Sequence, residues 1–89
     1  MRSLLELQKK LLPDMLEVMR KRYETLRHLQ LMQPVGRRSL ATAMGTTERI
    51  LRAEVDFLRV QGLVHVDPLG MRVTPQGAEL LAEMDPLIK

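Results

Sequence analysis

The chain of 89 residues contains no cysteine and no tryptophan, and its only aromatic side chains are one tyrosine and one phenylalanine. Without cysteine it cannot form disulfides or thiolate metal sites, which fits a reducing, cytoplasmic location. Tyr23 and Phe57 both fall on stripes that are predicted to face the core. Recognition of RNA or single strands by base stacking is therefore disfavoured.

Polar residues in catalytic or metal-binding arrangements are also lacking. His28 and His65 lie far apart without ligand spacing, and Ser3 and Ser39 have no base beside them in any motif. There is no glycine-rich phosphate loop, no signal peptide and no apolar run long enough to cross a membrane. The sequence thus predicts no enzyme, no cofactor, no metal and no membrane partner.

What the chain does have is a mild excess of positive charge in residues 1–74. Residues 1–32 carry seven basic and four acidic groups, and residues 33–74 carry six and four. The hydrophobic content of 45% is that of a globular protein, and the length allows a single domain with a modest core. A basic, globular domain of this size favours a polyanionic partner.

Residues 36–62 have the pattern of two helices joined by a tight turn. Leu40, Ala43 and Met44 recur at helical spacing, and Gly45 can take the left-handed conformation that ends a helix. Thr46 and Thr47 then offer a cap oxygen to a second helix. This order predicts a helix-turn-helix.

The second of these helices has two distinct faces. Leu51, Val55 and Leu58 share the face predicted to be buried, with Thr47, Ile50, Glu54 and Phe57 on its flank. The opposite arc carries Glu48, Arg49, Arg52, Ala53, Asp56 and Arg59. These residues are available to a partner.

A β-hairpin and a last helix are predicted to follow. Residues 63–66 and 71–74 are rich in β-branched residues and flank Asp67-Pro68-Leu69-Gly70, which has the signature of a type I turn. Thr74-Pro75 provides the cap and first-turn proline of a helix over about 75–85, which Asp85-Pro86 is predicted to close.

The leading segment is predicted to divide at Pro13-Asp14, a pair suited to the first turn of a helix. A long helix would begin there and end before Gln33-Pro34, with its C-terminal half completing the core. Residues 1–12 would form a short helix or an arm, and residues 13–89 the domain. The arm's leucines, at positions 4, 5, 11 and 12, would pack on the last helix or on a second copy.

Together these elements predict a mostly α fold with a small β-hairpin: a winged helix-turn-helix with a three-helix core, a wing at 63–74 and extra N- and C-terminal helices. The residues predicted to read DNA bases are Thr47, Glu48, Arg49, Arg52 and Ala53. Those predicted to bind phosphate are Arg37, Arg38, Ser39 and Arg59, with Arg72 on the wing.

Plainer interpretations stay open beside this one. Arg49 and Arg52 could be solvated helix residues, one of them paired with Asp56. The same fold could also bind a protein partner and have no DNA specificity. Salt dependence of binding to duplex DNA separates these alternatives, because only phosphate contacts release counterions.

Beyond these patterns, three segments carry a family resemblance: Gln8-Lys9-Lys10-Leu11-Leu12-Pro13-Asp14, Pro34-Val35-Gly36-Arg37-Arg38-Ser39-Leu40, and Glu48-Arg49 with Leu51-Arg52 and Glu54-Val55. On these residues the whole chain resembles the N-terminal DNA-binding domains of the central glycolytic genes regulators, bacterial transcriptional repressors of the SorC/DeoR-like group. Thr46 is a departure, since this turn residue is commonly apolar in the group.

The resemblance implies a double-stranded DNA operator as the partner and a repressor that is oligomeric there, so that a homodimer of this chain is a further partner to consider. It also implies a larger sugar-phosphate-sensing domain that responds to fructose 1,6-bisphosphate. That effector domain is absent from this chain, which therefore would not bind the sugar phosphate itself.

Overall fold

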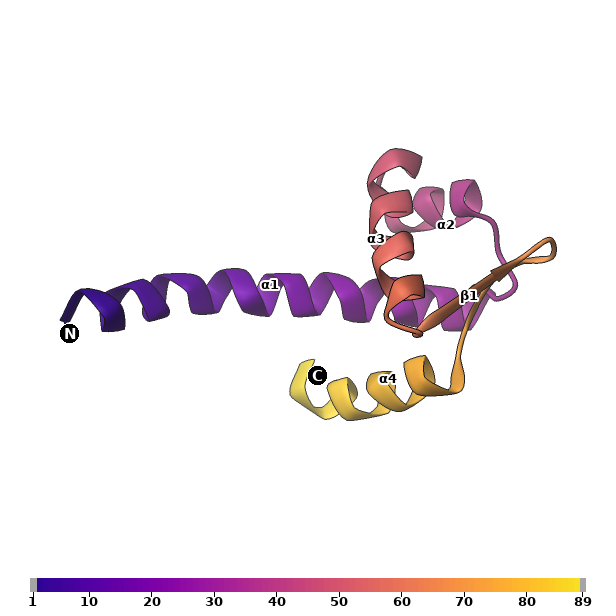
Figure 1. Ribbon diagram of the computed structural model, residues 1–89. Helices are drawn as coiled ribbons and strands as arrows, with labels where there is room; N and C mark the ends of the chain where they lie inside the picture. The colour runs from indigo at the N-terminus through magenta and orange to yellow at the C-terminus, as the bar shows by residue number, and fades with distance from the viewer. Residues whose placement is uncertain (1, 89) are drawn as a thin grey trace.

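Four helices and one β-hairpin make up the fold (Figure 1). The computed structural model describes the backbone of residues 2–88 and the side chains of residues 15–88. In chain order the elements are α1 (Arg2–Met32), α2 (Arg37–Met44), α3 (Glu48–Val60), β1 (Val64–Asp67), β2 (Gly70–Val73) and α4 (Pro75–Ile88). The predicted winged helix-turn-helix architecture is confirmed.

Helix α1 runs without interruption through Pro13, so the predicted helix start at Pro13 is wrong. An interior proline removes one backbone hydrogen bond, at a cost of about 3 kcal/mol. Ending one helix and starting another would require a second costly nucleus. The continuous helix extends well beyond the other elements, and the molecule measures 52 × 26 × 24 Å (Figure 1).

The core lies where the C-terminal half of α1 meets the other elements. Fully buried side chains come from α1 (Leu26, Leu29), α2 (Leu40), α3 (Leu51, Val55, Leu58) and β2 (Met71). Met15, Leu16, Val18 and Met19, on the projecting half, are exposed. This confirms that only the C-terminal half of α1 completes the three-helix core. Of the three α2 residues at helical spacing, Leu40 is buried, Met44 is half-buried and Ala43 is exposed, and Ala41 is buried beside Leu40.

The hairpin pairs Val64 with Val73 and Asp67 with Gly70, around a turn in which the Leu69 N–H donates to Asp67 Oδ1 at 2.8 Å. A third segment, which the sequence did not reveal, joins this sheet. Val35 exchanges two backbone hydrogen bonds with Met71, and Gln33 Oε1 accepts from the Val73 N–H. A Cβ on Gly70 would lie 2.8 Å from Val35 N, so only glycine permits this approach.

Helix α4 begins as predicted, with Thr74 Oγ1 accepting from the Gly77 N–H at 3.1 Å. It continues to Ile88, however, so the end predicted at Asp85-Pro86 is wrong. Pro86 removes only one hydrogen bond of the helix. The half-buried Ile88 packs against the core and holds the last turn in place.

Candidate nucleic-acid interface

Helix α3 is fixed by the turn that precedes it. Gly45 adopts the left-handed conformation, with φ 69°, and ends α2 as predicted. Of the two candidate caps, Thr47 is the one used, and its side-chain oxygen accepts from the Ile50 N–H at 3.2 Å. The turn therefore sets the angle at which α3 crosses α2.

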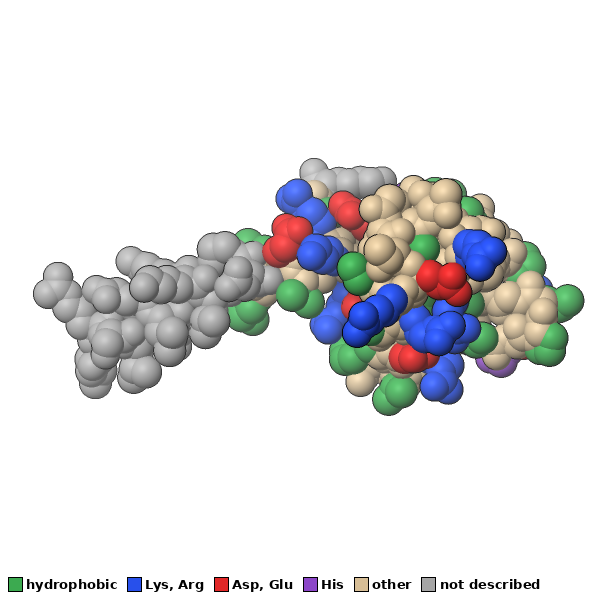
Figure 2. Space-filling view, turned by 90° about the horizontal axis from the view of Figure 1, so that it is seen from above, with side chains coloured by type: hydrophobic (Ala, Val, Ile, Leu, Met, Phe, Trp, Pro, Cys, Tyr) green, Lys and Arg blue, Asp and Glu red, His purple; other side chains and the backbone are tan. Residues whose placement is uncertain are grey.

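The two faces of α3 are confirmed. Leu51, Val55 and Leu58 are buried, whereas the opposite arc faces solvent, with only Asp56 half-buried. Figure 2 looks onto the side of the molecule where α2 and α3 lie, and lysine, arginine and acidic side chains alternate on it. The candidate interface is therefore of mixed charge rather than uniformly basic.

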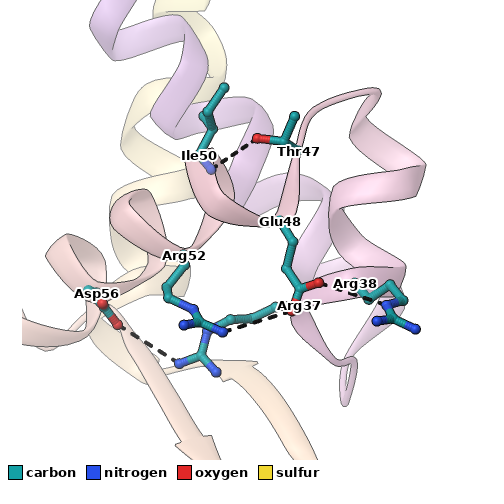
Figure 3. A network of polar contacts seen from close by, with 7 residues as sticks. All are labelled: Arg37, Arg38, Thr47, Glu48, Ile50, Arg52 and Asp56. Carbon is teal, nitrogen blue, oxygen red and sulfur yellow. Dashed lines mark hydrogen bonds and ion pairs between the residues drawn. The ribbon is translucent and has the colours of Figure 1, made fainter.

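The edge of α3 toward α2, termed the α2 edge, consists of Glu48, Arg52 and Asp56 together with Arg37 and Arg38 of α2. Glu48 Oε1 lies 3.9 Å from an Arg52 terminal nitrogen, and Glu48 Oε2 lies 3.8 Å from Arg38 Nε (Figure 3). Arg37 pairs with Asp56 at 3.8 Å. The alternative pairing of Asp56 with Arg49 or Arg52 does not occur.

The two arginines of α2 differ in burial. The side chain of Arg38 is 90% exposed, whereas that of Arg37 is 30% exposed and its Nε is buried without a hydrogen-bond partner. Gly36 caps α2 without any side-chain hydrogen bond, so the first-turn N–H groups stay available to an anion. Ser39 is exposed on the same turn. The start of α2 thus combines two arginines with the positive end of a short helix.

The remaining arginines predicted to contact DNA lie on α3 and on the wing. Arg49 and Arg59 are exposed on α3, and Arg72 is half-buried on β2, opposite His65. Among residues 15–88, these three arginines form no ion pair. They are therefore available to an external anion.

Ala53 is exposed on the opposite edge of α3, termed the α1 edge, which consists of Glu54 and Phe57 with Arg22 of α1. An open groove of about 610 Å³ runs here between α1 and α3, and Lys21, Ile50 and Ala53 also line it. The Arg22 guanidinium carbon lies 4.1 Å from the centre of the Phe57 ring, and its Nε lies 3.6 Å from Glu54.

Phe57 is 40% exposed, so its predicted place in the core is wrong. It lies at the margin of the buried stripe, and the guanidinium of Arg22 covers it in place of core side chains. Helical periodicity locates a stripe but not its margin. No spacing links Arg22 to a residue 35 positions further along the chain, so sequence analysis missed this cluster.

Tyr23, the other aromatic residue, is buried as predicted and links α1 to α4. Its hydroxyl donates a hydrogen bond to Asp85, and this bond, with burial as a second cause, raises the pKa of Tyr23 above its ordinary value. The same contact orients α4 along the C-terminal half of α1.

Two further observations concern the described residues alone. None of their helices is both long and apolar enough to span a bilayer. They contain no group of three or more histidine or acidic side chains placed to hold a metal ion.

A tight helix-turn-helix, arginines on the outer face of its second helix and a hairpin packed beside it define a winged helix-turn-helix domain of the DNA-binding class. Residues 18–88 match the family model described as the CggR N-terminal DNA binding domain. The chain belongs to this family, whose members are DNA-binding domains of transcriptional regulators and not enzymes.

Two curated relatives align with all 89 residues. The chain is 54% identical to the central glycolytic genes regulator of Priestia megaterium (strain DSM 319 / IMG 1521) and 48% identical to that of Bacillus subtilis (strain 168). It covers 26% of each relative. The chain thus spans about a quarter of the length of these regulators.

Proposed function

We propose that the chain binds a duplex DNA operator as the DNA-binding domain of a cytoplasmic repressor of central glycolytic genes. One observation carries this proposal: Arg52 on the outer face of α3 lies beside Arg37 and Arg38 of α2 (Figure 3), and Arg49 is exposed on the same helix. Helices of this kind enter the major groove, while the preceding helix contacts the backbone.

Each candidate residue has a role that matches its chemistry. Arg49 and Arg52 donate paired hydrogen bonds to guanine, and Glu48 accepts from cytosine. Thr47 and Ala53 complete the surface against the bases. The phosphate contacts come from Arg37, Arg38, Ser39 and Arg59, and Arg72 reaches the backbone or minor groove from the wing. Phosphate contacts set the register, and base contacts set the sequence preference.

The test is an anisotropy titration of the chain with labelled duplexes, one selected from a random library and one scrambled. We expect tighter binding to the selected duplex, and affinities for both that fall with rising salt. Equal affinity for the two duplexes would exclude sequence recognition. Salt-independent binding would exclude phosphate contacts.

We further propose that the remainder of the full regulator senses a sugar phosphate such as fructose 1,6-bisphosphate. We also propose that the 89-residue chain forms a homodimer through the projecting half of α1. Met15, Leu16, Val18 and Met19 are exposed there. The side chains of Leu4, Leu5, Leu11 and Leu12 lie outside the described residues, and their predicted packing stays a prediction.

Sedimentation equilibrium tests the homodimer. Deleting residues 1–12, or combining Met15→Lys with Met19→Lys, should lower the association constant, because burying even two such side chains stabilises by roughly 3 to 5 kcal/mol. Glu17→Lys adds the same total charge on the exposed helix and should have a much smaller effect. Unchanged association in the truncated and doubly substituted chains would exclude this interface.

A protein-binding role is the second candidate, and the groove on the α1 edge favours it, since Ile50 and Phe57 expose apolar surface there. This function predicts no salt-dependent affinity for duplex DNA. The titration above therefore distinguishes the two functions.

A further inference from the structure

A single carboxylate on the α2 edge holds two arginines that belong to different helices. Glu48 is the first residue of α3, and its two oxygens point to different partners. Oε1 lies 3.9 Å from Arg52, one helical turn further on, and Oε2 lies 3.8 Å from Arg38 of α2 (Figure 3). The side chain thus bridges a candidate base-reading arginine and a candidate phosphate-binding arginine.

Neither arginine is held by anything else among the described residues. The side chains of Arg38 and Arg52 are 90% and 61% exposed, and Glu48 is the sole ion-pair partner of each. Exposed ion pairs of this length are weak and exchange readily with solvent or with another anion. Both arginines can therefore exchange Glu48 for DNA. Because they share the Glu48 carboxylate, this exchange breaks both of its ion pairs.

The consequence for Glu48 depends on whether the DNA presents a hydrogen-bond donor or an acceptor to its carboxylate. When a phosphate takes Arg38 and a guanine takes Arg52, the carboxylate is left unpaired against the major groove. Most groove atoms there are acceptors, namely guanine O6 and N7, adenine N7 and thymine O4, and these repel a carboxylate. The amino groups of cytosine and adenine are the donors that can satisfy it.

We propose that Glu48 is a specificity-determining residue that suppresses binding to non-operator DNA. Resting on the proposed DNA-binding function, this inference assigns Glu48 a role beyond a contact with one base. A duplex with an amino donor at the right position compensates the loss of both ion pairs. A duplex without one leaves the carboxylate unsatisfied and is bound more weakly. Discrimination thus comes largely from a penalty on wrong sequences.

The test compares Glu48→Gln with Glu79→Gln in the 89-residue chain. Both variants remove one negative charge without changing side-chain size, and Glu79 is exposed on α4, away from the α2 edge. The probe is a labelled duplex of mixed sequence without a selected site, titrated by anisotropy between 50 and 200 mM NaCl. We expect Glu48→Gln to strengthen binding about 3- to 10-fold more than Glu79→Gln.

The salt dependence provides a second measurement. In Glu48→Gln the slope of log affinity against log salt should steepen by up to about 1, because Arg38, which Glu48 holds back in part in the parent chain, can then hold its phosphate contact in full. In that background Arg38→Ala should cost more affinity than it does in the parent chain. Glutamate in the first turn favours the helix, so the substitution slightly lowers the melting temperature. Stronger binding therefore cannot result from a more stable fold.

The outcomes separate this inference from the function on which it rests. Equal gains in Glu48→Gln and Glu79→Gln would overturn it, since net charge would then explain the effect. Weaker binding of Glu48→Gln to mixed-sequence DNA would also overturn it, because Glu48 would then support binding rather than restrain it. Absence of salt-dependent binding by the parent chain would overturn the proposed DNA-binding function itself.

Discussion

The two edges of α3 use the same chemical pair, an arginine with a glutamate, in opposite ways. On the α1 edge the side chains of Arg22 and Glu54 are 37% and 28% exposed, and Arg22 also covers the Phe57 ring. On the α2 edge Arg38 and Arg52 meet Glu48 in solvent. A half-buried arginine with a second, aromatic contact holds helices together. An exposed arginine with one weak partner is available for exchange.

The largest effect is expected on the α2 edge. Arg52→Ala should weaken binding to a selected operator by about 1 to 3 kcal/mol and relax the preference at one base position, because a bidentate guanine contact is lost. Arg52→Lys keeps the charge but not the fork of donors, and should lose specificity while retaining most affinity for mixed-sequence DNA. Equal losses of Arg52→Ala on operator and scrambled duplex would refute base reading.

Arg37 and Arg38 allow a second test of the same edge. Replacing both by alanine should reduce affinity for all sequences and flatten the salt slope by about 1 to 2 units, since fewer counterions are released. An anisotropy titration at several salt concentrations measures this slope. Because Arg37 is the more buried of the two, Arg38→Ala alone should account for most of the change. A slope unchanged in the double variant would exclude the phosphate role.

A substitution on the α1 edge should lower the stability of the fold rather than the affinity for DNA. Arg22→Ala removes the contact with Phe57 and part of the cover of the groove, and should destabilise the chain by about 1 kcal/mol. For a domain of this size that corresponds to a fall of about 5 °C in the melting temperature. Arg20→Ala is the matched control, because Arg20 is exposed and without an ion pair among the described residues. Loss of DNA affinity by folded Arg22→Ala would break the contrast between the two edges.

The smallest effect concerns Tyr23, which touches neither edge of α3. Its hydrogen bond to the Asp85 carboxylate raises the pKa of Tyr23 above the ordinary value of 10.0. The stability from this contact is therefore fully present below about pH 10 and is lost as pH rises through the raised pKa. In urea unfolding, the parent chain should have a higher free energy of unfolding than Tyr23→Phe, and this difference should decrease only above pH 10. A difference in the free energy of unfolding that stays constant up to pH 11 would contradict this prediction.

The sequence predicted the elements of the fold because local rules decided them. Gly45, Thr47 and Thr74 terminate or cap helices through bonds within a few residues, and the buried face of α3 follows from its periodicity. The prolines at 13 and 86 misled the prediction, because helix continuity and packing outweighed a local penalty.

The candidate site was less predictable, since spacing shows which arginines face outward but not what they meet. The pairs Arg38–Glu48, Arg37–Asp56 and Arg22–Glu54 each join two helices whose relative placement no local pattern encodes. The docking of Val35 on β2 has the same origin, because a single residue bridge leaves no run of strand-forming residues to detect.

That docking has a mechanical consequence. Gln33 and Val35, which directly follow α1, form hydrogen bonds with β2, so the hairpin is attached to α1 as well as to α3. With 31 residues, α1 is a rod of about 46 Å. A rotation of the far end of α1 about the helix axis would therefore also move the wing. The angle at which the wing meets DNA would then depend on the position of the N-terminal end of α1.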